Sequence, residues 1–499
     1  MNGADLIAIT PELILLAAAC AVVLVEAFVH PQGADAAGGA DRAGGKWGLF
    51  VAVLGLVASA ATALGLLGQE RVAFGGMLTL DEWAVFFKVL FGVGGALVVL
   101  MSPAYLRAHQ RHLGEYYALL LFAVIGMDLM AAARDFVLFY VGLELMAISS
   151  YLLAAFFRYR LKSGESSLKY FVTGSVASAI TLYGISLVYG LTGSTGYEAV
   201  GAVLGVEGSP GGGTGAVFAV FLVTIGLAFK VSAAPFHMWT PDVYQGAPTP
   251  VAAFFSVGPK AAGFAVFLAA FLTAFGGVSR EWGMLLVVLS VLTMLVGTLY
   301  ALVQTNVKRM LAYSSIAHAG YLLAGLGAVG WTGEARAGYG VLAYLVAYTV
   351  MNLGAFAVLA LLKTESSDRF DYSLSHLAGL GRRSPWSALI LSLMLLSLTG
   401  IPGTAGFIGK FYLFGGVIWA GMWWLAVVGV VFSAVSAYYY LRVIVYMFFR
   451  EPEEAVAGRT PLKGGMAVSL AVTTLATLAI GLVPSWLLEV ARAAYQALL

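Results

Sequence analysis

Long apolar runs, separated by short polar breaks, fill almost the whole chain. A helix that crosses the hydrocarbon core of a bilayer needs about 20 mostly apolar residues, and most of the runs reach this length. The pattern therefore predicts an all-α integral membrane protein with about 14 transmembrane helices. The predicted spans are 10–29, 47–67, 80–101, 115–133, 135–157, 167–192, 215–239, 248–275, 282–303, 308–330, 336–362, 385–420, 423–449 and 462–489.

The polar stretches between these runs are too short to form a separate soluble domain. The longest are 30–46, 193–214 and 363–384, and the first two are rich in Gly, Ala and Ser, which is typical of flexible loops. We therefore expect residues 1–499 to form a single polytopic membrane domain. Residues 1–12 contain no Lys or Arg, so the first apolar run is interpreted as a span rather than as a cleavable signal peptide.

Composition narrows the function classes further. Charged residues make up only 10% of the chain and hydrophobic residues 61%, whereas soluble domains average about 25% charged residues. The net charge of +2 gives no basic field that would attract nucleic acid. Cys20 is the single cysteine, which excludes an internal disulfide and a cysteine-ligated iron–sulfur cluster.

Lys and Arg gather in alternate loops between the predicted spans. The odd-numbered loops carry pairs such as Arg107 with Arg111 and Lys308 with Arg309, whereas the even-numbered loops carry single residues such as Arg280. The positive-inside rule places the odd-numbered loops in the cytoplasm. With an even number of helices, both termini are expected on the outer side of the membrane.

Four ionisable residues lie inside apolar runs, where charge is costly. They are Glu144, Lys230, Lys260 and Lys410. A charge near the bilayer centre costs at least about 2.5–3.5 kcal/mol on insertion scales, so such groups usually face a hydrated interior or pair with one another. For any one of them the simpler interpretation is an ion pair that joins two helices. The four together favour a path for ions or protons.

Two of these lysines lie near prolines that should interrupt a spanning helix. Lys230 comes five residues before Pro235, and Lys410 comes eight residues after Pro402. Proline removes a helix hydrogen bond, and a broken helix at membrane depth must line a cavity or be buried in protein. Paired broken helices indicate the ion site in transporters built from repeats, although a proline kink without function is the simpler alternative.

The two predicted breaks fall in spans seven and twelve, five helices apart. Because five is odd, a five-helix unit that is repeated once is inverted in the membrane. The spacing predicts two inverted five-helix repeats with discontinuous helices 7 and 12. The expected segments are 1–112 (helices 1–3), 113–276 (helices 4–8), 277–450 (helices 9–13) and 451–499 (helix 14).

The residue types suit proton movement. Burial makes a lysine easier to deprotonate and a nearby carboxylate opposes this, so Glu144 could control proton loading at Lys230. His237 and His318 are candidate relay residues, although a polar anchor and a hydrogen-bonded core histidine are their simpler interpretations. Lys88 and Asp128 lie near span ends, and we expect them to reach the membrane interface.

Signals for other chemistry are missing from the sequence. The stretch GTAGFIGKF differs from a P-loop in spacing and has Phe411 where a Ser or Thr is required. The sequence has no HExxH motif and no evident haem or iron–sulfur ligand set. We therefore expect no metal, nucleotide or redox cofactor in this chain.

Three long stretches together resemble a known family. They are FKVSAAPFHMWTPDVYQGAPTPVAAFFSVGPKAAGF, YVGLELMAISSYLLAAF and GIPGTAGFIGKFYLF, and the short stretch SSIAHAGY adds to them. The chain is similar over nearly its whole length to the proton-translocating, antiporter-like subunits of respiratory complex I, and within them to the subunit N branch.

The resemblance implies a membrane-arm subunit of NADH:quinone oxidoreductase, a proton translocase in a bacterial inner or plasma membrane. It implies 14 helices in two inverted repeats, and it places the family's proton-transfer residues on Glu144, Lys230, Lys260 and Lys410. NADH, FMN, iron–sulfur clusters and quinone are then expected in other subunits. The implied partners are the other membrane-arm and peripheral-arm subunits, the lipid bilayer and protons.

Two other functions compete with this one. A stand-alone or multisubunit cation/proton antiporter of the sodium-resistance type would carry the same buried lysines and glutamate. A membrane scaffold subunit without transport would need none of these ionisable residues. The long stretch from Phe229 to Phe264 favours the complex I subunit over the antiporter.

Overall fold

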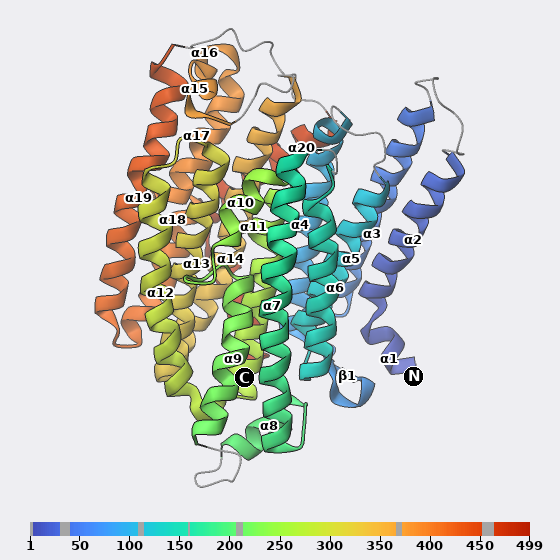
Figure 1. The fold of residues 1–499 in the computed structure, drawn as a ribbon, viewed down its shortest axis with the longest axis vertical. Helices are drawn as coiled ribbons and strands as arrows, with labels where there is room; N and C mark the ends of the chain where they lie inside the picture. Colours follow the sequence, from blue (N-terminus) through green and yellow to red (C-terminus); the bar gives the residue numbers. More distant parts are fainter. Residues whose placement is uncertain are drawn as a thin grey trace.

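The computed structural model describes residues 3–29, 40–107, 114–157, 160–205, 213–365, 372–451 and 464–499. Within these ranges nearly every element is an α-helix, and most of the helices run side by side along one direction (Figure 1). The helices α2 and α3 lie at one edge of this array, and α12 and α19 lie at the other. The prediction of a helical, multi-span membrane protein is confirmed.

Eleven helices in the described residues are long and apolar enough to cross a membrane. Their outer faces carry exposed apolar side chains, such as Leu168, Phe171 and Val172, as expected where lipid replaces water. These helices are α2 (Thr10–Val29), α3 (Ala40–Gly65), α4 (Glu82–Arg107), α5 (Gly114–Ala132), α6 (Phe136–Ala154), α7 (Leu161–Thr192), α11 (Thr249–Thr273), α12 (Ser279–Leu302), α14 (Ala335–Glu365), α19 (Trp423–Phe449) and α20 (Gly464–Leu482).

The remaining predicted spans correspond to other helices. The span 308–330 matches α13 (Val307–Thr332), the span 215–239 contains the apolar helix α9 (Thr214–Lys230), and the span 385–420 contains α17 (Pro385–Thr399) and α18 (Ala405–Trp419). Whether these helices complete 14 crossings stays a prediction. The shorter helices are α1 (Gly3–Ala8), α8 (Tyr197–Leu204), α10 (Trp239–Gly246), α15 (Leu374–Leu377), α16 (Leu380–Arg383), α21 (Ser485–Gln496) and the 3₁₀ helices η1 (Phe74–Gly76) and η2 (Gly276–Val278).

One small departure from the all-α prediction occurs between α3 and α4. Strands β1 (Arg71–Ala73) and β2 (Leu78–Leu80) pair antiparallel, with Arg71 opposite Leu80. Phe74 has a positive φ of 52°, and its N–H donates to Asp5 Oδ1 at 3.0 Å, so α1 holds the turn in place. The prediction missed this hairpin because its strands are only three residues long.

The helix α11 forms the centre of the molecule. All residues from Thr249 to Phe271 are buried, and α4, α5, α13 and α14 pack around the helix. Beside it, α12 and α13 pack closely because glycines face the partner backbone. A Cβ atom at Gly297 would lie 2.4 Å from Ala317 N, and one at Gly320 would lie 2.8 Å from Met294 N. Small residues permit such close packing between helices at membrane depth.

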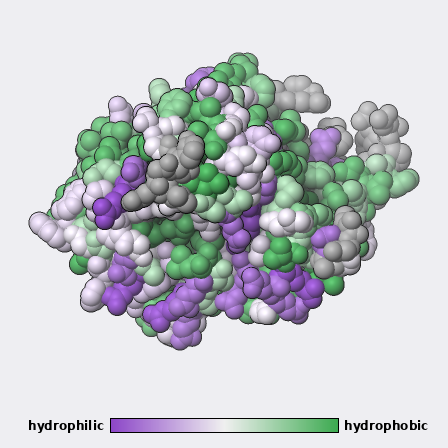
Figure 2. Space-filling view, turned by 90° about the horizontal axis from the view of Figure 1, so that it is seen from below, coloured by the Kyte–Doolittle hydropathy of each residue, from purple (hydrophilic) through white to green (hydrophobic). Residues whose placement is uncertain are grey.

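The end of the molecule near the chain termini differs from its sides. Viewed along the helices from below, hydrophilic residues gather in patches on this end face, and hydrophobic residues extend to its margins (Figure 2). Such a distribution fits a protein whose ends meet water while its sides meet lipid.

Candidate functional site

Lys230 is the last residue of α9 and is 2% exposed. Its Nζ atom has no hydrogen-bond partner among the described residues and lies 5.6 Å from the centre of the Tyr151 ring. A buried ammonium without a partner is unfavourable. The position therefore suits a group that exchanges its proton with water or with a carboxylate that approaches it.

The chain is not helical between Lys230 and α10, at the position predicted from Pro235. Ser232 has a φ of 63°, and Ala234 N donates to Thr293 Oγ1 of α12 at 2.9 Å. Trp239 Nε1 donates to the carbonyl of Phe229 at 3.0 Å, so an indole satisfies one of the last carbonyls of α9. These contacts fix the interrupted segment to its neighbours.

The segment after Lys230 also packs directly on α11. A Cβ atom at Gly263 would lie 2.8 Å from Val231 Cγ1 and 3.8 Å from Lys230 Cβ. Glycine at this position therefore lets the Lys230 backbone approach the central helix, one turn from Lys260.

Glu144 lies on α6 and is partly exposed. Its Oε1 accepts a hydrogen bond from Ser178 Oγ of α7, and its charge acts on Lys230. The structure thus brings Glu144 within electrostatic reach of Lys230.

Lys260 lies in the middle of α11 and is 3% exposed. Its Nζ atom donates to the Ser315 carbonyl at 3.0 Å and to Ser315 Oγ at 2.5 Å. Lys260 is therefore bound to α13, in contrast to Lys230, whose Nζ lacks such partners among the described groups.

His318 lies one turn beyond Ser315 on α13 and is 2% exposed. Its Nδ1 shares a hydrogen bond with the hydroxyl of Tyr344, and its Nε2 lies 3.1 Å from the hydroxyl of Tyr440. The Tyr440 hydroxyl also bonds to Ser314 Oγ. The imidazole is therefore held between two hydroxyl groups that can each donate or accept a proton.

Lys410 lies on α18 near the break that follows α17, and it is 7% exposed. Its Nζ atom donates to the carbonyls of Leu398 and Thr399, each at 2.9 Å, and to Ser433 Oγ at 2.6 Å. The two carbonyls belong to the last turn of α17, where carbonyl groups lack partners within the helix. A cation at this end also complements the helix dipole.

One face of α13 connects Lys260 to Lys410. Ser315, His318 and Tyr321 recur every three residues, so they lie on one side of the helix, about 4.5 Å apart along its axis. Ser315 accepts from Lys260, and Lys410 Nζ lies 5.3 Å from the centre of the Tyr321 ring. A row of buried polar groups on α13 therefore lies between the two lysines, although the Tyr321 hydroxyl has no hydrogen-bond partner among the described residues.

Two members of this row, and three groups that contact its residues or Lys410, were not predicted from the sequence. They are Ser315 and Tyr321 in the row, and Tyr344, Ser433 and Tyr440 outside it. The i, i+3, i+6 spacing on α13 is a signal that could have identified Ser315 and Tyr321. The other three lie on α14 and α19, and no spacing along α13 indicates them.

The other candidate residues lie at the two breaks. His237 is partly buried in the segment between α9 and α10, and its Nδ1 has no hydrogen-bond partner among the described groups. Pro235 lies in the same segment. Pro402 lies between α17 and α18, where Gly400 and Gly403 have φ values of 96° and 84°. Neither His237 nor the prolines contact the α13 row through a recorded hydrogen bond of the described residues.

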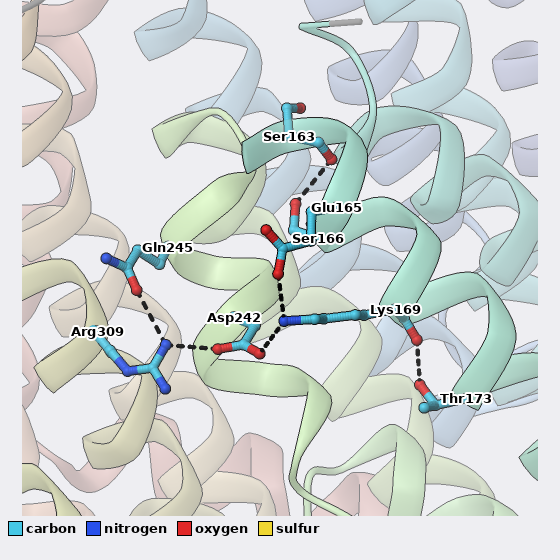
Figure 3. A network of polar contacts seen from close by, with 8 residues as sticks. All are labelled: Ser163, Glu165, Ser166, Lys169, Thr173, Asp242, Gln245 and Arg309. Carbon is cyan, nitrogen blue, oxygen red and sulfur yellow. Dashed lines mark hydrogen bonds and ion pairs between the residues drawn. The ribbon is translucent and has the colours of Figure 1, made fainter. Parts of the chain in front are cut away.

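A charged network lies where α7, α10 and α13 meet (Figure 3). Asp242 of α10 accepts from Lys169 of α7 at 2.9 Å and from Arg309 of α13 at 2.6 Å. Glu165 binds Lys169 at 2.7 Å, and Gln245 Oε1 accepts from Arg309 at 3.0 Å. The network borders a cleft of about 140 Å³. The cleft is lined by residues of α7 and α10, and Arg309 of α13 joins the network through Asp242 and Gln245.

Two charged residues lie in places that contradict the sequence analysis. Lys88 and Asp128 were expected to reach the membrane interface, but each is only 1% exposed. The prediction was wrong because neighbouring helices bury both span ends: Lys88 pairs with Glu12 of α2.

The described residues contain no group of three or more His, Cys, Asp or Glu side chains that could hold a metal ion.

Comparisons with known proteins identify the family of this chain. Residues 133–436 match the family described as NADH:quinone oxidoreductase/Mrp antiporter, transmembrane region. NADH-quinone oxidoreductase subunit N of Trichlorobacter lovleyi is 42% identical over 98% of this chain and 96% of that protein. The chain belongs to this family. The subunit N 1 of Solibacter usitatus is likewise 42% identical, over 98% of this chain and 97% of that protein.

Two solved structures have the same fold. A chain of respiratory complex I from Thermus thermophilus is 36% identical, with a TM-score of 0.78 over 96% of this chain and 98% of that one. A chain of the Mrp complex from Dietzia sp. has a TM-score of 0.84 over 100% of this chain and 98% of that one, at 22% identity. The second likeness shows a shared fold.

Proposed function

We propose that this chain is a proton-translocating, antiporter-like subunit in the membrane arm of NADH:quinone oxidoreductase. It couples electron transfer from NADH to quinone, which takes place in other subunits, to proton transport across the membrane. The subunit N relatives and the complex I chain from Thermus thermophilus support this function. The other complex I subunits are accordingly its partners, and NADH, FMN, iron–sulfur clusters and quinone bind elsewhere in the assembly.

The row of polar groups on α13 carries the proposed mechanism. Protons enter from the cytoplasm near Lys230, pass to Lys260, and continue along Ser315, His318 and Tyr321 to Lys410. Glu144 controls the proton on Lys230 through its charge. His237 is a candidate relay at the entry. Lysine, histidine and tyrosine can each give up a proton and regain it, whereas arginine stays protonated.

The proposed topology has 14 transmembrane helices, with helices 7 and 12 interrupted at Pro235 and Pro402. Residues 113–276 and 277–450 form two inverted repeats, preceded by 1–112 and followed by 451–499. The protein lies in a bacterial inner membrane with both termini on the periplasmic side. The charged network around Asp242 then lies on the cytoplasmic side, and its cleft between α7 and α10 is the proposed start of the proton path to Lys230.

A cation/proton antiporter is the second candidate function. The fold shared with the Mrp complex favours it, because the same interrupted helices and buried lysines could exchange cations for protons. NADH-driven quinone reduction and cation/proton exchange, measured together in the Lys230→Ala variant, separate the two functions.

Replacing His318 tests the proposed path. We expect His318→Leu to lower NADH-driven proton uptake in membrane vesicles by about an order of magnitude or more. Leucine cannot accept or donate a proton, so Ser315 and Tyr321 lose the group that lies between them. His376→Leu, the same change in the short helix α15, should leave uptake near the wild-type rate. Wild-type uptake in His318→Leu would show that protons take another path.

A further inference from the structure

A second group of buried charges lies away from the α13 row. Glu12 in the first turn of α2, Lys88 in the second turn of α4 and Asp128 near the end of α5 are 5%, 1% and 1% exposed. All three precede residues 133–436, which match the family, and none belongs to the proposed proton path.

The hydrogen bonds within this group are incomplete. Lys88 Nζ donates to Glu12 Oε1. Glu12 Oε2 and both carboxylate oxygens of Asp128 have no hydrogen-bond partner among the described residues. Lys88 and Glu12 are the charged groups that act on Asp128. The group therefore has three buried oxygen atoms without a donor among the described residues, and it contains one ammonium.

The charges do not balance if every group is ionised. Two carboxylates and one ammonium leave one negative charge in a site to which the described residues add no second cation, and an uncompensated buried charge is strongly unfavourable. One proton removes this charge. Because Lys88 already donates to Glu12, Glu12 is the ionised partner and Asp128 is the group left to take the proton. The O–H of a protonated Asp128 also supplies a donor to a cluster whose remaining oxygens lack one.

We propose that Glu12, Lys88 and Asp128 form a second buried proton-binding site, in which Asp128 holds one exchangeable proton. The site lies at the end of α2, α4 and α5 that carries the chain's N-terminal helix α1 (Figure 1). In the expected orientation this end faces outward, so the site exchanges its proton with the outer side of the membrane. The proposal depends on the charge balance of these three residues and stands whether or not the chain pumps protons.

The charge balance predicts that a substitution at Glu12 changes the protonation of Asp128. Asp128→Asn replaces a neutral acid with a neutral amide, so the cluster keeps its charge balance. Glu12→Gln removes the partner of Lys88, and Asp128 must then lose its proton to neutralise the ammonium. A carboxylic acid at Asp128 should therefore disappear in Glu12→Gln although Asp128 is still present.

Infrared spectroscopy of the purified whole complex tests this proposal. We expect wild type to show a carboxylic acid C=O band that shifts in D₂O, and both Asp128→Asn and Glu12→Gln to lack this band. Glu144→Gln, a change at a carboxylate outside the cluster, should retain it.

Identical spectra for wild type and Asp128→Asn would overturn the proposal, because Asp128 would then be ionised. Retention of the band in Glu12→Gln would also overturn it, because the proton would not depend on the charge of Glu12. If Glu12→Gln does not assemble, the comparison of wild type with Asp128→Asn still decides.

Discussion

Replacing Lys260 with methionine should lower NADH-driven proton uptake and quinone reduction together, by about an order of magnitude or more. Lys260 is the central member of the proposed path, in a helix buried from Thr249 to Phe271. Methionine has a similar shape and fills the space, but it cannot carry a proton. The measurement is the rate of both reactions in vesicles that contain the whole complex.

Arginine at the same position separates charge from proton transfer. Lys260→Arg keeps a donor for Ser315 but does not release its proton under physiological conditions. We therefore expect Lys260→Arg to assemble at the wild-type level and to pump no better than Lys260→Met. Wild-type pumping in the arginine variant would mean that Lys260 supplies only a fixed charge.

Replacing Lys410 with methionine should have two effects, a loss of pumping and a loss of stability. The Nζ atom of Lys410 binds two carbonyls in the last turn of α17 and the hydroxyl of Ser433. Removing a donor from buried acceptors costs about 1–3 kcal/mol for each group left unsatisfied. We expect a lower unfolding temperature of the purified complex and proton uptake reduced by about an order of magnitude.

Two matched variants separate these effects. Ser433→Ala removes one acceptor and leaves Lys410 bound to both carbonyls, so its stability and pumping should stay close to wild type. Lys410→Arg can still donate to the carbonyls but keeps its proton. It should therefore recover stability without recovering pumping. If Lys410→Arg pumps like wild type, the lysine has only the structural role of closing α17.

The sequence was sufficient to predict the membrane class, most helices and the four ionisable residues inside apolar runs, of which the three lysines are buried. Apolar runs of spanning length can be recognised without tertiary information, and a charge inside such a run stands out. Breaks near Pro235 and Pro402 were predicted because proline and glycine act on the local backbone. The described helices α9 and α17 do end close to these positions.

Other parts depend on contacts between distant segments. Tyr344 and Tyr440 reach His318 from α14 and α19, and their own helices give no sign of this. The burial of Lys88 and Asp128 depends on how α2, α4 and α5 pack, so their positions near span ends were misleading. Short strands such as β1 have too few residues for a periodic pattern.

The Lys230→Ala variant gives the most direct test of the central claim, that this chain carries protons whose movement is coupled to redox chemistry in other subunits. The measurement is NADH-driven quinone reduction and proton uptake in membrane vesicles from wild type and variant, with cation/proton exchange measured alongside. We predict that quinone reduction and proton uptake fall together. Unchanged NADH oxidation, together with the loss of a cation/proton exchange activity, would contradict the account and favour an independent antiporter.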